Sequence, residues 1–140
     1  MQEIQVLVKD KPGELARVTE ILGDHGINIR GISSDTRKRG DSFLRIVVNK
    51  EDQEKATSLL SISGGYKVKT NTLLFLSLIN RPGELAKVAK LLAKQGINVE
   101  SIYLRGSKKG LSGRPETEVV MNVSDLSGAQ KLLKSFVVKK

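Results

Sequence analysis

Apolar and polar residues alternate at the start of the chain and then recur at helical spacing. Ile4, Val6 and Val8 alternate with Gln5 and Lys9, and this alternation predicts a strand with one face in the core. Apolar residues at positions 15, 18, 21 and 22 then follow one face of a helix. A helix is expected over residues 12–25, because proline is tolerated in a first turn and Gly26 can end it.

The rest of the first half predicts a hairpin, a second helix and a closing strand. Turn-rich residues 33–42 separate a strand that begins at Ile27 from another at 43–49. Ala56, Leu59 and Leu60 mark the second helix, and residues 66–70 the last strand. The order βαββαβ is the split-βαβ or ferredoxin-like arrangement, an α+β fold whose antiparallel sheet carries both helices on one face.

The same pattern returns 70 residues later. Between residues 10–33 and 80–103, 11 of 24 aligned positions are identical. The identical residues of the first copy are Pro12, Gly13, Glu14, Leu15, Ala16, Val18, Leu22, Gly26, Ile27, Asn28 and Ile32. A match of a sequence with itself at a fixed offset indicates a repeated structural unit. We therefore predict two tandem modules, residues 1–70 and 71–140, with too few residues between their strands for a flexible linker.

Each copy carries one motif in the same register. Residues 10–15 read Asp-Lys-Pro-Gly-Glu-Leu, residues 80–85 read Asn-Arg-Pro-Gly-Glu-Leu, and Gly-Ile-Asn follows at the start of each second strand. This arrangement resembles the ACT-domain family over nearly the whole chain. The resemblance implies ferredoxin-like regulatory modules that bind amino acids or other small effectors, often at an interface between paired domains.

The resemblance also implies which side chains contact an effector. In members that bind serine-like effectors, these are the polar residue two places before Pro-Gly and the asparagine of the second strand. Pairing of domains about a pseudo-two-fold axis would join Asn80 with Asn28, and Asp10 with Asn98. A histidine that some members carry two places before the loop position is replaced here by Val8 and Leu78, which leaves the effector open.

The residue chemistry supports a site for an amino acid independently. An asparagine amide offers a donor and an acceptor side by side, as a neighbouring carboxylate and ammonium require. Unpaired N–H groups at a helix start can receive the carboxylate, and glycine there allows a close approach. The candidate ligand-binding residues are Asp10, Gly13, Glu14, Leu15, Asn28, Asn80, Gly83, Glu84, Leu85 and Asn98.

Each candidate also has a structural interpretation. Asp10 and Asn80 can form Asx turns or helix caps, and Asn28 and Asn98 can hydrogen-bond their own loops. Asp10, when ionised, only accepts hydrogen bonds, whereas Asn80 also donates. We therefore expect the two copies to differ in binding, with the Asn80 loop preferred.

The amino-acid composition also argues against several kinds of site, among them disulfides and zinc sites. The chain has no cysteine and a single histidine, His25, so neither a disulfide nor a zinc site is expected. His25 is placed near a helix C-terminus, where partial positive charge is favourable. Because no nucleophile–base pair, phosphate-binding glycine loop or paired carboxylate is evident, we expect no enzyme activity and no cofactor.

The net charge of +9 admits an acidic partner. Basic residues gather in the two predicted hairpins: Arg37, Lys38, Arg39, Arg105, Lys108, Lys109 and Arg114. Solvated loops explain them, and an RNA-binding module that uses these hairpins is an alternative. Only three Phe and two Tyr are present, which does not match the aromatic platform of an RNA-binding sheet, so nucleic acid is not the favoured partner.

The longest apolar run, residues 73–79, is too short to cross a membrane, and the N-terminus has no signal-peptide pattern, so cytoplasm is expected. Leu73, Phe75, Ser77 and Ile79 should lie on the helix-free face and form an apolar patch, which suggests a homo-oligomer. The sequence thus predicts a non-catalytic sensor that binds a small amino acid at the interface between its two modules and signals to a metabolic enzyme or regulator. An effector-free regulatory subunit is the other alternative.

Overall fold

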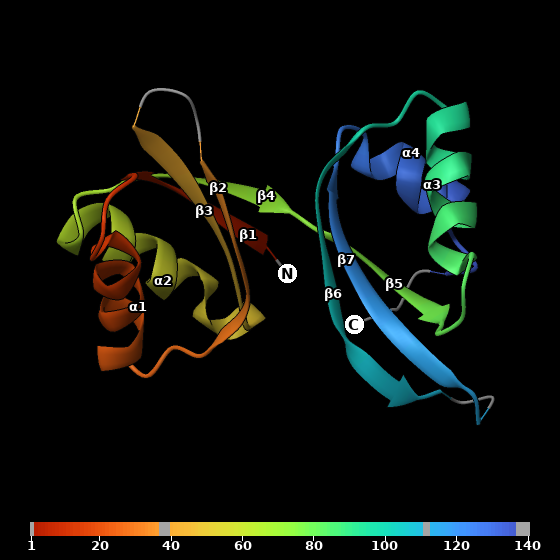
Figure 1. Ribbon diagram of the computed structural model, residues 1–140, viewed down its shortest axis with the longest axis horizontal. Helices are drawn as coiled ribbons and strands as arrows, with labels where there is room; N and C mark the ends of the chain where they lie inside the picture. The colour runs from red at the N-terminus through yellow and green to blue at the C-terminus, as the bar shows by residue number, and fades with distance from the viewer. Residues whose placement is uncertain (1, 37–39, 111–112, 137–140) are drawn as a thin grey trace. The chain divides into compact units, whose positions relative to one another are not determined.

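The structure is a computed structural model, and it describes residues 2–36, 40–110 and 113–136 (Figure 1). The chain divides into two compact units, Met1–Thr72 and Leu73–Lys140. In each, the order of elements follows the repeat seen in the sequence.

The first unit contains one four-stranded antiparallel sheet in the order β2-β3-β1-β4. Its elements are β1 (Gln2–Lys9), α1 (Glu14–Asp24), β2 (Ile29–Thr36), β3 (Asp41–Val48), η1 (Lys50–Asp52), α2 (Gln53–Ser58), η2 (Leu59–Ser63) and β4 (Lys67–Thr72). Figure 1 shows α1 and α2 on one face of this sheet. This is the ferredoxin-like arrangement that the sequence predicts.

The second unit repeats the arrangement with a sheet in the order β5-β7-β6. Its elements are β5 (Leu74–Ile79), α3 (Glu84–Lys94), β6 (Val99–Lys109), β7 (Pro115–Val123) and α4 (Leu126–Leu132). The predicted closing strand at 136–140 lies outside the described residues except for Phe136. The carbonyl of Phe136 accepts a hydrogen bond of 2.9 Å from the N–H of Ser77 in β5. The α+β fold of two tandem modules is confirmed.

Each unit has an aliphatic core between its sheet and its helices. The first core joins Ile4 and Val6 of β1 to Val18 and Leu22 of α1, all 0% exposed. The second is built from the matching positions of β5 and α3. Its buried members are Leu74, Leu76, Leu78, Val88, Leu92, Ile97, Val119, Met121, Val123, Ala129 and Leu133. The alternation and the helical spacing thus identify most of the buried positions, but Leu15 of the predicted helical face is 53% exposed.

The first helix of each unit is shorter than predicted. Gly13 and Gly83 are the N-cap residues, with φ of 92° and 90°, so the helices begin at Glu14 and Glu84 rather than at the prolines. At the other end His25 is the C-cap residue of α1, and its Nδ1 lies 2.8 Å from the carbonyl oxygen of Ile21. The expected position of His25 at a helix C-terminus is confirmed.

The hairpins contain less turn and more strand than predicted. β2 continues to Thr36 and β6 to Lys109, because the register with β3 and β7 persists into the polar stretch. Arg105, Lys108 and Lys109 consequently lie in a strand and not in a loop. The three basic residues 37–39 lie outside the described residues.

The second helical segment of the first unit changes its hydrogen bonding along its length. α2 ends at Ser58, and Leu59–Ser63 continue as a π-helical turn.

In the part of the chain that the structure describes, no helix is long and apolar enough to cross a membrane.

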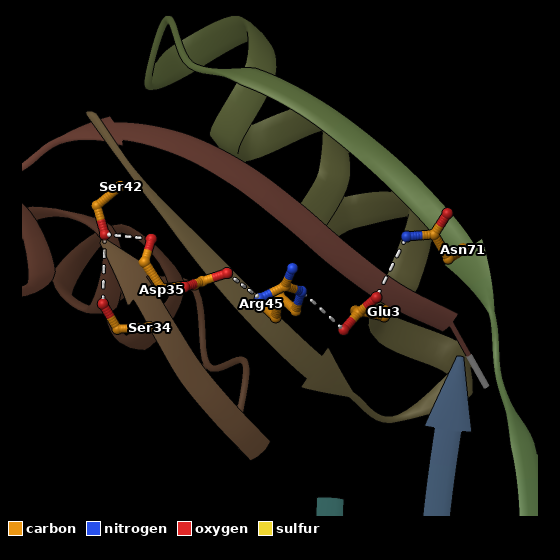
Figure 2. A network of polar contacts seen from close by, with 6 residues as sticks. All are labelled: Glu3, Ser34, Asp35, Ser42, Arg45 and Asn71. Atoms are coloured by element: carbon orange, nitrogen blue, oxygen red, sulfur yellow. Dashed lines mark hydrogen bonds and ion pairs between the residues drawn. The ribbon is translucent and has the colours of Figure 1, made fainter. Parts of the chain in front are cut away.

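A chain of polar contacts crosses the helix-free face of the first sheet, with one residue from each strand (Figure 2). Asn71 of β4 donates from Nδ2 to Oε2 of Glu3 in β1 at 3.2 Å. Arg45 of β3 lies 3.8 Å from Glu3 through Nε and 3.5 Å from Asp35 of β2 through Nη1. Glu3 is completely buried, so these contacts offset the cost of burying its charge.

The helix-free face of the second sheet is apolar but less exposed than expected. Leu73 and Phe75 are only 5% and 9% exposed, and Ser77 and Ile79 are partly buried. Phe75 pairs with Val120 of β7, and side chains directly opposite one another lie on the same face. The predicted exposed patch at Leu73 and Phe75 is therefore wrong.

Candidate functional site

The loops that follow β1 and β5 hold the polar residues of the repeated motif. Asp10 and Asn80 are both exposed. Each loop is tied to the neighbouring hairpin by a backbone hydrogen bond, from Asp10 N–H to Gly40 O at 2.7 Å and from Asn80 N–H to Pro115 O at 2.9 Å. The two loops thus have the same backbone anchoring and differ at two side chains, Asp10 against Asn80 and Lys11 against Arg81.

The turn into each helix is made by a left-handed glycine. Because the N-cap positions are Gly13 and Gly83, neither Asp10 nor Asn80 occupies that position. A Cβ added to either glycine would meet nothing within 4 Å, so the space beside the turn is open. A small molecule can therefore approach the backbone here, as the sequence suggested.

The leucine of each motif is more exposed than the glutamate that precedes it in the second unit. Leu15 and Leu85 are 53% and 37% exposed, whereas Glu84 is only 7% exposed. An exposed leucine next to an open turn supplies apolar surface for contact with a ligand or with a second domain.

Glu84 is the centre of an ion-pair cluster in the second unit. Its Oε1 accepts a hydrogen bond of 2.6 Å from Nε of Arg81 and one of 2.9 Å from Nζ of Lys87. The hydrogen bond from Lys87, followed by that from Arg81, holds the pKa of Glu84 below its ordinary value. Since a general base works best with a pKa near the operating pH, Glu84 is suited to binding rather than to proton transfer.

A pocket of about 130 Å³ lies beside this cluster. It is lined by Leu78, Ile79, Asn80, Arg81, Glu84, Leu85, Leu104, Thr117 and Val119. Three predicted site residues, Asn80, Glu84 and Leu85, are therefore together at one pocket. Arg81 was missed, although its place in the motif three residues before Glu84 was a usable signal.

The asparagines of the second strands lie elsewhere in their own units. β5 and β6 are both antiparallel to β7 and therefore run parallel to each other. Asn80 follows the end of β5 and Asn98 precedes the start of β6, so the two asparagines lie at opposite ends of the sheet. The same strand directions separate Asp10 from Asn28 in the first unit.

Asn98 has local hydrogen-bond partners. Its Nδ2 donates to Oε1 of Glu100 at 3.3 Å, and its backbone N–H donates to Oγ of Ser124 at 2.9 Å. These contacts correspond to the structural interpretation of this residue. Across the described ranges, no group of three or more His, Cys, Asp or Glu side chains could hold a metal ion.

Solved structures share this tandem fold. The chain is 24% identical to protein BT0572 from Bacteroides thetaiotaomicron, with a TM-score of 0.79 over 98% of this chain and 90% of that one. It is 18% identical to the regulatory subunit of aspartate kinase from Thermus thermophilus, with a TM-score of 0.67 over 96% and 91%. For the corresponding subunit from Thermus flavus the values are 19% and 0.67, over 96% and 88%. At these identities the likeness concerns the fold.

Comparison of the amino-acid sequence with protein-family profiles identifies the family of the chain. No curated protein matches the chain significantly. The profile of the ACT domain matches twice, over residues 3–62 and 72–137, one match in each repeat. These two matches cover most of the chain and include the motif and the pocket described above. The chain therefore belongs to the ACT domain family.

Proposed function

We propose that this protein is a non-catalytic regulator that binds a small amino acid at the loop following β5 and passes the bound state to a metabolic enzyme or another regulator. Membership of the ACT domain family supports a regulatory role in binding a small molecule. The observation that carries the proposal is the pocket of about 130 Å³, where three of the motif residues converge.

The chemistry of this pocket matches a zwitterion. Arg81 can receive a carboxylate, and Glu84, which is charged at neutral pH, can attract an ammonium. The Asn80 amide can serve either group. A liquid water molecule occupies about 30 Å³, so the pocket has the volume of only a few waters. The favoured effectors are therefore amino acids with short side chains.

A second domain is needed to complete the set of candidate residues. Because Asn98 lies at the far end of the same sheet, an asparagine can join the Asn80 loop only from another domain, in this chain or in a second copy. The pseudo-two-fold pairing that the family resemblance implies would bring Asn28. A homo-oligomer and the location of the protein in the cell stay predictions.

A thermal-shift screen against the twenty amino acids tests the proposal. A ligand that binds only the folded chain adds about 2.7 kcal/mol of stability at 100 times its dissociation constant. We expect a concentration-dependent rise in Tm with one or a few small amino acids. If none of the twenty raises Tm, the effector-free regulatory subunit replaces this proposal.

RNA binding is the remaining alternative and has a distinct signature. Its affinity would fall steeply with salt. Arg105, one of its candidate residues, lies 3.8 Å from Glu118 and is mostly buried, which makes its charge less available to a phosphate. Tight, sequence-dependent RNA binding at physiological salt would favour this alternative.

A further inference from the structure

A second pocket lies in the first unit, between the first turn of α1 and the start of β4. Its volume is about 340 Å³, within the range typical of small-molecule sites. It is lined by Leu7, Val8, Lys9, Lys11, Glu14, Arg17, Asp41, Gly65, Tyr66 and Lys67. Every lining residue belongs to the first unit, and none belongs to the pocket at Asn80.

Tyr66 fixes one wall of this pocket. Its hydroxyl donates to Oε2 of Glu14 at 3.0 Å, and the guanidinium carbon of Arg17 lies 4.8 Å from the centre of its ring. Arg17 also donates from Nη2 to the carbonyl of Gly64 at 2.9 Å. The guanidinium is thus held in place by the ring and the carbonyl, and the carboxylate of Glu14 contacts both Tyr66 and Lys11.

Positive charge dominates the rim. The lining includes four basic and two acidic residues, and the side chain of Glu14 is only 17% exposed whereas that of Lys11 is 60% exposed. Lys9 and Lys67 are exposed as well. A concave surface whose lining carries net positive charge attracts a compact anion.

We propose that this pocket binds the phosphate group of a small molecule. Lysine binds phosphate as a flexible point charge, whereas a planar carboxylate is best matched by the fork of an arginine. Lys9 and Lys67 are exposed, whereas Lys11 lies 3.9 Å from Glu14 and Arg17 already contacts Gly64 and Tyr66. The lining therefore fits a phosphate better than a carboxylate, and the volume leaves room for a small group attached to it.

The second repeat lacks these features at the matching positions. Seventy residues after Lys9, Tyr66 and Lys67, the sequence has Ile79, Phe136 and Val137. Two lysines and one hydroxyl are thus replaced by apolar groups, although the two repeats share the motif of the loop itself. This difference assigns the phosphate pocket to the first repeat alone and separates it from the proposed amino-acid site.

Nuclear magnetic resonance titration of the full chain tests this inference. The probes are inorganic phosphate and glycerol 3-phosphate, neither of which has the ammonium of an amino acid, and sodium chloride keeps the ionic strength constant. We expect saturable shifts of the amides of residues 7–11 and 65–67. Tighter binding of glycerol 3-phosphate would identify a phosphate monoester as the ligand, and equal or weaker binding would identify the free ion.

The double variant Lys9→Ile, Lys67→Val installs the residues of the second repeat, and Lys90→Ile removes an exposed lysine from α3 as the control. The double variant should bind both probes about tenfold more weakly, and the control should bind like the wild-type chain. Absence of saturable shifts in the wild-type chain, or equal weakening in the control, would overturn the phosphate site. Either result leaves the amino-acid proposal untouched, since that pocket lies in the other repeat.

Discussion

Replacing the N-cap glycines by alanine should destabilise the chain through the backbone alone. Gly13 and Gly83 have φ of 92° and 90°, a region that L-residues other than glycine seldom adopt. A Cβ at either position meets nothing within 4 Å, so a clash with neighbouring atoms does not contribute. The effect of Gly13→Ala or Gly83→Ala therefore measures the conformational preference directly.

The expected magnitude is the difference of two terms. Left-handed backbone costs about 1–2 kcal/mol for an L-residue. Alanine also restricts the unfolded chain, which returns about 0.4–1 kcal/mol. Each variant should therefore lose about 1 kcal/mol of unfolding free energy.

Gly23 of α1 provides the matched control. It lies inside the helix, and a Cβ there also meets nothing within 4 Å. Gly23→Ala should stabilise the chain by about 0.5–1 kcal/mol, because alanine is the better helix former. The second repeat already has Ala93 at this position.

Urea denaturation at equilibrium measures all three variants, with an unchanged m-value as the check that the unfolding transition is comparable. If Gly13→Ala and Gly83→Ala are as stable as the wild-type chain, the left-handed turn is not what requires glycine. Loss of effector binding without loss of stability would instead show that glycine is kept for close approach of the ligand.

Three further predictions follow from the ion pairs and the titratable groups. Arg45→Ala removes the cation 3.8 Å from the buried carboxylate of Glu3 and should lower the unfolding free energy measured in urea by about 3 kcal/mol. The double variant Arg45→Ala, Glu3→Leu should recover much of this unfolding free energy. No recovery in the double variant would contradict the pairing. Because hydrogen bonds from Lys87 and Arg81 lower the pKa of Glu84, its stabilisation is complete above the unfolded pKa of about 4.3 and is lost as pH falls through the folded pKa. Unfolding free energies measured from pH 7 to pH 2 should therefore fall less for Lys87→Met than for the wild-type chain. Burial raises the pKa of Tyr66, so its contribution is present below pH 10 and is lost as pH rises through the folded pKa. Tyr66→Phe should reduce the loss of stability between pH 9 and pH 12, and an unchanged alkaline profile would argue against a contribution from the partly buried phenol.

The sequence predicts those parts of the fold that repeat local patterns. Alternation at Ile4, Val6 and Val8, and helical spacing at Val18 and Leu22, identify residues that are buried in the structure. The length of the hairpins was not predictable in this way. Polar residues up to Lys109 continue in β6 because they pair with β7, and this pairing depends on a distant strand.

The residues of the candidate sites also fall into two groups, those that a local sequence motif identifies and those that distant segments of the chain bring to the site. The motif identifies Asn80 and Glu84, because neighbours in sequence are also neighbours at the pocket. Leu104 and Thr117 reach that pocket through the register of the sheet, for which a single sequence has no local signal. Tyr66 meets Glu14 from 52 residues away, and only the exchange of tyrosine for phenylalanine between the repeats hinted at a special role.

Calorimetric titration of the full chain with the amino acid identified by the thermal-shift screen tests the central claim most directly. The claim is that the loop after β5 binds the effector, with the Asn80 amide as a contact that Asp10 does not match. Asn80→Ala should weaken binding about tenfold or more, and Asp10→Ala should change it little. Wild-type affinity in Asn80→Ala, with or without a loss of stability, would contradict the claim.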